Sequence, residues 1–143
     1  MGLGVESLEG IGSGHPSMTC LLDTHFLIWI TSDSKRLRRY PWLGHYEPWG
    51  VSPISLFEIQ LLTEGGKLSL RNPQFTDAVL SDARFVVDEV PSVALIRRSL
   101  ELSWTRDPFD RLIAAHSLAR RTPLCSVDSS ILQNHKLLVP ELR

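Results

Sequence analysis

Carboxylates gather at the junctions between predicted strands and helices in this chain. Asp107 and Asp110 stand three residues apart in the segment DPFDRLIAAH, at the start of a predicted helix. Asp23 follows the apolar run TCLL, Asp128 follows PLCSV, and Glu58 lies in the first turn of the helix predicted after GVSP. Because these are oxygen donors without a cluster of histidine or cysteine beside them, they suit Mg²⁺ or Mn²⁺. The pattern therefore indicates a divalent-metal site.

Each of these acids also has a structural explanation. Asp23, Asp107 and Asp128 directly precede predicted helices, where a carboxylate caps the free backbone N–H groups. Ser55 and Glu58 form the sequence S-x-x-E, which is typical of a capping box. Capping accounts for each acid taken singly, but it does not require that the acids lie on neighbouring strands.

The elements that must position these acids alternate between strands and helices. Strands are predicted at residues 19–23, 50–53, 84–90, 122–128 and 136–140. Helices are predicted at residues 24–30, 55–68, 72–83, 91–102, 108–120 and 129–135. This alternation predicts an α/β fold, a three-layer α/β/α sandwich with a central, mainly parallel sheet.

The predicted topology brings the acids together. Ligands of open parallel sheets bind beyond the carboxyl ends of the strands, where Asp23 and Asp128 meet if their strands are neighbours. Two like charges about 4 Å apart repel by roughly 4 kcal/mol at an effective dielectric near 20, so converging acids require a cation or raised pKa values. Cys20 and Cys125 each precede one of these aspartates by three residues. We therefore expect their thiols to lie level, close together and reduced.

Composition excludes several classes of protein. The 143 residues suit one domain, and the formal net charge of -1 gives no global sign of a nucleic-acid binder. No stretch of about 18 unbroken apolar residues predicts a membrane span, and no basic-then-apolar leader predicts secretion. Two cysteines make neither a disulfide framework nor a zinc site. We expect a cytoplasmic protein with no membrane partner.

The first seventeen residues differ in composition from the rest. Five of the nine glycines lie in the first fourteen positions, and Met18 directly precedes the first predicted strand. We interpret residues 1–17 as a flexible leader derived from an expression vector, with Met18 as the natural start. A native disordered arm is the alternative.

Three sequence blocks, in this order, resemble a known family: LLDTHFLIW, ISLFEIQLLTEGGKL and DPFDRLIAAHSLARRTPLCSVD. They are similar to the PIN-domain ribonucleases, and most closely to the VapC toxins of bacterial toxin–antitoxin pairs. The resemblance runs from about Met18 to Pro140, and DPFDRLIAA is its most specific piece. It implies that residues 18–143 form a PIN-like nuclease domain with metal-dependent endoribonuclease activity.

The resemblance implies a role for each acid. It makes Asp23, Glu58, Asp110 and Asp128 the catalytic carboxylates that bind Mg²⁺ or Mn²⁺ for phosphodiester hydrolysis. The metal would activate a water and neutralise charge on the scissile phosphate. Glu58 or Asp23 would orient or deprotonate that water. The family implies products with a 5′-phosphate and a 3′-hydroxyl.

Other residues are expected to support the acids. Thr24 and Ser126 match positions close to the metal in the family, and Asp107 is either a helix cap or an outer carboxylate of the site. Arg106 and Arg111 flank the DPFD segment and are candidate contacts to the RNA substrate. Either arginine could instead lie on a solvent-exposed surface without contact to RNA.

Residues 32–50 are predicted to be irregular and combine positive charge with aromatic rings. The positive charges are Lys35, Arg36, Arg38 and Arg39, and the aromatic residues are Tyr40, Trp42, Tyr46 and Trp49. The aromatic rings could belong to the core, to an interface, or to a surface that stacks single-stranded RNA bases. We favour core or interface.

Histidines in the matching blocks are interpreted as structural. His116 stands where many relatives have glutamine or threonine, about one and a half turns from Asp110, so we expect a satisfied helix histidine and not a metal ligand. His25, inside the DTH sequence, is expected to be partly buried and not catalytic.

The resemblance also implies partners: RNA as substrate, a cognate antitoxin protein and a second copy of the chain in a homodimer. A phosphate-accepting receiver module is disfavoured because none of the three lysines ends a late strand. An aspartyl phosphatase is disfavoured because D-T-H lacks the second acid of D-x-D. A catalytically silent PIN-fold module that binds RNA or protein remains the alternative.

Overall fold

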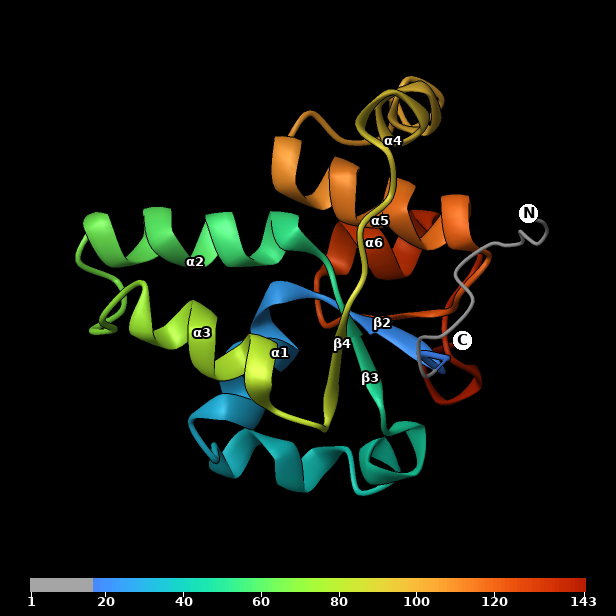
Figure 1. The fold of residues 1–143 in the computed structure, drawn as a ribbon. Coiled ribbons are helices and arrows are strands. Elements are labelled where there is room, and N and C mark those ends of the chain that lie inside the picture. Colours follow the sequence, from blue (N-terminus) through green and yellow to red (C-terminus); the bar gives the residue numbers. More distant parts are fainter. Residues whose placement is uncertain (1–16) are drawn as a thin grey trace, which may run out of the picture.

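A four-stranded parallel sheet lies at the centre of the computed structural model, which describes residues 17–143 (Figure 1). Its strands follow the order β4-β3-β2-β5, and every neighbouring pair is parallel. Their bounds are Cys20–Leu22 for β2, Trp49–Val51 for β3, Phe85–Val87 for β4 and Leu124–Cys125 for β5. The leader predicted at residues 1–17 lies outside the described residues except for its last position, so it stays a prediction.

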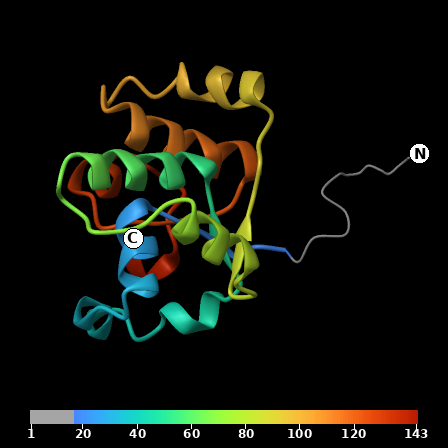
Figure 2. The same cartoon turned by 60° about the vertical axis from the view of Figure 1, so that its left-hand side comes forward.

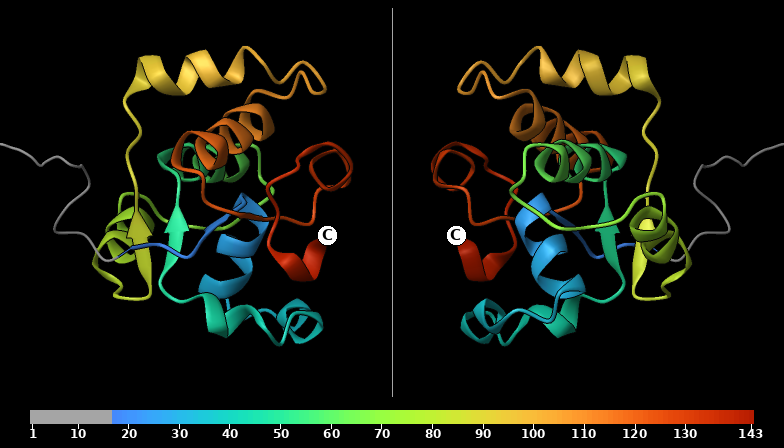
Figure 3. Two further views of the ribbon diagram at one scale, coloured as in Figure 1. Left: turned by 90° about the vertical axis from the view of Figure 1, so that its right-hand side faces the viewer. Right: turned by 90° about the vertical axis from the view of Figure 1, so that its left-hand side faces the viewer.

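Helices cover both faces of the sheet, which confirms the predicted three-layer α/β/α architecture (Figures 2 and 3). The helices are α1 (Thr24–Thr31), α2 (Pro53–Glu64), α3 (Gln74–Ser81), α4 (Ser92–Ser99), α5 (Pro108–Arg120) and α6 (Ser129–Asn134). Helix α4 packs on the outer side of α5, away from the strands. Within residues 17–143 no helix has both the length and the apolar character needed to cross a membrane.

Strand β2 separates two apolar layers because its successive side chains point to opposite faces. Cys20 and Leu22 enter the layer that contains Phe26 of α1. Leu21, between them, packs with Ile113 of α5 on the other face. All five side chains are buried, so the strand that ends at the acidic residues is fixed from both sides.

The two cysteines lie on adjacent strands, as predicted, but they are not level. Leu21 pairs with Leu124 and Leu22 with Cys125, which places Cys125 two residues further along than Cys20. Our prediction of level thiols is therefore wrong, because β5 ends at Cys125 and the chain leaves the sheet before Asp128. Both cysteines are free and buried, and burial raises the pKa of Cys20 to about 12.

Two other segments differ from prediction. The strand expected at 136–140 is reduced to a single bridge between Leu124 and Leu138, because the chain turns into a 3-10 helix at Pro140–Leu142. The segment 32–50, expected to be irregular, contains the 3-10 helices η1 (Lys35–Arg39) and η2 (Leu43–Tyr46) before β3 begins. Trp49 is buried in the core and donates to the Leu43 carbonyl, in agreement with the core interpretation of this aromatic residue.

A close contact crosses the middle of the sheet at Gly50. A Cβ atom at this position would lie 2.9 Å from the Cys20 carbonyl oxygen and would also overlap the side chain of Met18. Glycine is therefore the residue that lets β3 approach β2 here.

Candidate active site

Asp23 connects the ends of two neighbouring strands. Its Oδ1 accepts from the Phe26 N–H at 3.0 Å and so caps α1, while its Oδ2 accepts from Ser126 Oγ at 2.7 Å and from the Val127 N–H at 3.1 Å. Burial raises the pKa of Asp23, and these three hydrogen bonds oppose that rise by favouring the charged form. The cap predicted from the sequence is present, and the same carboxylate also holds the segment after β5.

Ser126 brings the residues of two acids together. Its hydroxyl donates to Asp23 and accepts from the Asp128 N–H at 3.0 Å. Asp128 in turn caps α6, since its Oδ2 accepts from the Ile131 N–H at 3.0 Å. Ser126 is fully buried, so this connection is shielded from water.

Glu58 is not part of a capping box, because α2 begins earlier than predicted. Ser52 is the N-cap, and its hydroxyl oxygen accepts from the Ile54 N–H at 3.2 Å. Glu58 therefore lies in the second turn, and its Oε1 accepts a hydrogen bond of 2.6 Å from Thr24. Thr24 also lies 3.1 Å from the buried Ser55 hydroxyl, so the start of α1 holds the glutamate toward the other acids.

Asp107 caps α5, as predicted. Its Oδ1 accepts from the N–H groups of Phe109 and Asp110 at 2.9 Å and 3.0 Å. Pro108 occupies the first helical position, where the missing N–H costs nothing. This arrangement leaves the Asp110 carboxylate free of capping, one turn into the helix.

The pKa of Asp110 shows that the acids lie within electrostatic range of one another. Burial is the largest cause that raises its pKa to about 7, followed by the negative charges of other carboxylates. Those carboxylates, in decreasing order of effect, are Asp128, Asp107, Glu58 and Asp23. Burial and neighbouring negative charge also raise the pKa of Glu58. Acids from the N-terminal parts of α1, α2, α5 and α6 thus lie within electrostatic range of one another, and we name Asp23, Glu58, Asp110 and Asp128 the acidic pocket.

The acidic pocket has the donor chemistry of a divalent-cation site. Its ligands would all be carboxylate oxygens, and a cation would relieve the repulsion that raises the pKa of Asp110. No three histidine, cysteine, aspartate or glutamate side chains of residues 17–143 are close enough together to hold a metal ion. The donor types fit Mg²⁺ or Mn²⁺, and ion binding remains a prediction.

The two candidate substrate arginines differ in their surroundings. Arg111 donates through Nε to the Ser99 carbonyl at 2.8 Å and through Nη1 to the Thr105 carbonyl at 3.3 Å, so it braces the connection between α4 and α5. Arg106 is exposed. A contact of either arginine with RNA stays a prediction.

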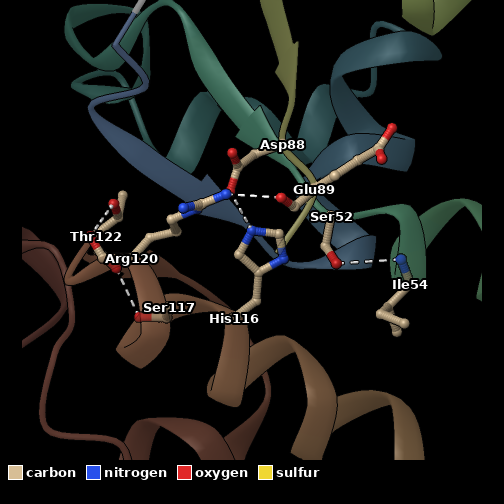
Figure 4. A network of polar contacts seen from close by, with 8 residues as sticks. All are labelled: Ser52, Ile54, Asp88, Glu89, His116, Ser117, Arg120 and Thr122. Carbon is tan, nitrogen blue, oxygen red and sulfur yellow. Dashed lines mark hydrogen bonds and ion pairs between the residues drawn. The ribbon is translucent and has the colours of Figure 1, made fainter. Parts of the chain in front are cut away.

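Sequence reasoning missed a polar network on the far part of α5 (Figure 4). Asp88 Oδ2 lies 2.7 Å from His116 Nε2 and accepts from Arg120 Nε at 2.8 Å. Arg120 also donates to the Glu89 carbonyl at 2.7 Å. Burial acts to raise the pKa of Asp88, but the hydrogen bonds from His116 and Arg120 outweigh it, and the pKa is lowered. The network ties the end of β4 to the helix that carries Asp110.

His116 is a buried helix residue, only 1% exposed, and its ring is satisfied on one side alone. Because the ionised Asp88 carboxylate can only accept, Nε2 carries the hydrogen of that contact. Nδ1 has no hydrogen-bond partner within the described part of the chain, so the prediction of a fully satisfied histidine is not met. The only signal for this network in the sequence is an acid directly after a β-branched strand.

Comparisons with known proteins agree with this architecture. Residues 20–136 match the model of the PIN domain family. The chain is 31% identical over 126 residues to Ribonuclease VapC22 of Mycobacterium tuberculosis, in an alignment that covers 82% of this chain and 92% of that protein. Its fold is similar to that of a chain in a toxin–antitoxin complex from Klebsiella pneumoniae, with a TM-score of 0.61, 20% identity, and coverage of 84% and 95% of the two chains. The chain therefore belongs to the PIN domain family, as its sequence blocks had indicated.

Proposed function

We propose that this protein is the endoribonuclease toxin of a VapBC-type toxin–antitoxin system and hydrolyses RNA phosphodiester bonds with Mg²⁺ or Mn²⁺. The observation that supports the proposal is that the half-buried Asp110 lies within electrostatic range of Asp128, Glu58 and Asp23, whose charges add to burial in raising its pKa to about 7. The relative named as a ribonuclease, which aligns with most of the chain, supports the same activity.

Asp23, Glu58, Asp110 and Asp128 would hold the cation once their side chains close around it, because no three of them form a ligand group as they are placed in the described residues. When bound, it supplies positive charge that neutralises the scissile phosphate and lowers the pKa of a water. Asp23 is the fixed member of the set, because it is 3% exposed and its two oxygens already accept three hydrogen bonds.

Glu58 is the better candidate to orient the attacking water. It is half-buried, and its one hydrogen bond within residues 17–143 comes from Thr24. That bond stabilises the charged carboxylate, which is the form that accepts a proton. Attack by this water on phosphorus, in line with the 3′-oxygen as leaving group, would give a 5′-phosphate and a 3′-hydroxyl.

A nuclease that acts freely on cellular RNA requires an inhibitor. We propose a cognate antitoxin whose basic residue enters the acidic pocket, and the complex that contains the structural neighbour supports a partner of this kind. We also propose a homodimer in the cytoplasm, where the RNA substrate lies. The exposed apolar side chains of Val93 and Ile96 on α4, and of Leu100 directly after it, support self-association, and light scattering of the purified protein would check it.

Cleavage of structured RNA tests the proposed activity. The protein is incubated with RNA and Mn²⁺ or Mg²⁺, with and without chelator, beside Asp23→Asn and Asp77→Asn. Asn keeps the ability to cap α1, while Asp77 is an exposed acid on α3 and serves as the matched control. We expect chelator and Asp23→Asn to abolish cleavage and Asp77→Asn to retain it. Equal cleavage by the wild type and Asp23→Asn would mean a contaminating nuclease and would support the catalytically silent alternative.

A further inference from the structure

A hollow of about 380 Å³ on the surface is lined only by aromatic and basic residues. They are Trp29 and Tyr40 with Lys35, Arg36 and Arg39, and we name this set the basic–aromatic pocket. The rings of Trp29 and Tyr40 lie nearly parallel, at 19° and 6.3 Å between centroids, and the guanidinium of Arg36 lies 5.7 Å from the Trp29 centroid. Planar rings and planar cations of this kind offer stacking surfaces to nucleobases.

The cations of the basic–aromatic pocket are available to a ligand. Lys35, Arg36 and Arg39 are exposed and form no ion pair with an acid of residues 17–143. They are held together by η1, whose start is capped by Ser34 through a 3.2 Å hydrogen bond from the Arg36 N–H. Three unpaired cations around one hollow favour a ligand with several negative charges, such as successive phosphates.

The aromatic side of the pocket is anchored in the core. Tyr40 packs edge-on against the buried Phe26, with 4.9 Å between ring centroids. Phe26 also packs against Trp29, at 5.5 Å. The two stacking rings are therefore held in place before a ligand arrives, which reduces the entropy lost on binding.

Helix α1 connects this pocket to the acidic pocket. Asp23 caps the beginning of α1, and η1 follows shortly after its end. His25, expected to be partly buried, is exposed, and its ring lies 6.1 Å from that of Trp29. Trp29 follows Asp23 by six positions, a rise of about 9 Å along the helix, or about three stacked nucleotides at about 3.4 Å each.

We propose that the basic–aromatic pocket binds the single-stranded RNA segment that flanks the scissile bond. A base stacks on the aromatic and guanidinium planes, while Lys35, Arg36 and Arg39 pair with its neighbouring phosphates. The inference rests on the proposed ribonuclease function for the place of the scissile bond, which would lie at the acidic pocket near the other end of α1, but RNA binding can be measured without cleavage. Unlike an acidic protein segment, single-stranded RNA uses both the rings and the cations.

RNA binding by single-arginine variants tests the proposal. Fluorescence anisotropy is measured with a labelled single-stranded RNA and a duplex of the same length, in chelator, so that cleavage does not interfere. Arg36→Ala and Arg39→Ala are compared with Arg38→Ala, which removes the same charge from the same 3-10 helix but does not line the hollow. We expect about a tenfold rise in Kd for the two pocket variants and less than about twofold for the control. Trp29→Leu should also weaken binding, because it removes the indole ring on which a base would stack. Leucine is chosen because it leaves an apolar side chain at this position.

The remaining outcomes separate this inference from the proposed function. Equal weakening by Arg36→Ala and Arg38→Ala, or equal affinity for duplex and single strand, would overturn the inference. Unchanged RNA binding by Arg39→Ala together with lost inhibition by the antitoxin would overturn it in favour of an acidic protein partner. Pocket-dependent RNA binding by a protein that cleaves no RNA would sustain the inference and refute the nuclease. If cleavage occurs, the pocket variants should raise KM and leave kcat within about twofold.

Discussion

Replacing Asp110 with asparagine should stabilise the metal-free protein at alkaline pH. The pKa of Asp110 is raised from 3.8 to about 7, first by burial and then by the charge of Asp128. Between these values the folded protein keeps a proton that the unfolded chain releases, so the contribution of Asp110 to stability falls as pH rises from about 4 to about 7. Asparagine has no charge to bury and should remove this pH dependence.

The size of the effect follows from that pKa difference. A rise from 3.8 to about 7 corresponds to about 4 kcal/mol if none of it is screened. Because Asp110 is only partly buried, water and salt screen its charge, and we expect about 1–2 kcal/mol between pH 5 and pH 8. For a chain of this length that corresponds to about 3–6 °C in Tm.

Thermal unfolding in chelator at pH 5, 6, 7 and 8 provides the assay. The Tm of Asp110→Asn relative to that of the wild type should rise as pH increases across this range. The Tm of Asp77→Asn, a variant on the surface of α3, should follow that of the wild type. Addition of Mn²⁺ at pH 8 should then raise the Tm of the wild type and not that of Asp110→Asn, because binding to the folded state stabilises it.

Two results would refute this reasoning. Parallel Tm curves for wild type and Asp110→Asn from pH 5 to pH 8 would mean that folding does not raise the pKa of Asp110. A lower Tm for Asp110→Asn at pH 8 would mean that its charge stabilises the fold and that the acids do not repel one another.

Three further predictions concern the sheet, the polar network and the glutamate. Gly50→Ala should lower the free energy of unfolding by about 2 kcal/mol in urea titrations, since the new Cβ meets the Cys20 carbonyl oxygen at 2.9 Å. Asp88→Asn should lower the free energy of unfolding by about 1–3 kcal/mol at pH 7. Because the pKa of Asp88 is lowered in the folded protein, this loss of stability should shrink as pH falls below 3.8, the ordinary pKa of the group. Thr24→Val should reduce kcat and move the acid limb of the rate–pH profile upward, because Glu58 loses the hydrogen bond that opposes its raised pKa.

The layered fold could be predicted from sequence because each predicted strand is followed by one or two helices before the next strand. Strand ends were harder to predict. The run PLCSV is largely apolar, yet the chain leaves the sheet after Cys125, and this produced the two-residue error in the thiol register. The strand predicted at 136–140 failed because Pro140 begins a 3-10 helix, although Val139 still donates to the Leu124 carbonyl.

The acidic residues could be found from sequence because each stands just after a strand or near the start of a helix, but their contacts could not. The sequence prediction took Ser55 as the cap of α2, although Pro53 at the first helical position favours Ser52, which the structure shows to be the cap. Asp88 lacked any such signal, because His116 and Arg120 come 28 and 32 residues later and meet it only in the folded chain.

Three of the acids at the site, Asp23, Asp107 and Asp128, also cap helices. This double role determines which substitutions would inactivate the protein without destabilising its fold. Replacing such a residue with alanine removes a cap worth about 1 kcal/mol as well as a carboxylate, whereas asparagine or serine keeps the cap. Surviving clones under growth selection should therefore fall into two groups. If the protein is the proposed toxin, clones with Asn or Ser at Asp23 or Asp128 would accumulate intact, inert protein that still engages the proposed antitoxin, and clones with aliphatic replacements would be depleted by proteolysis.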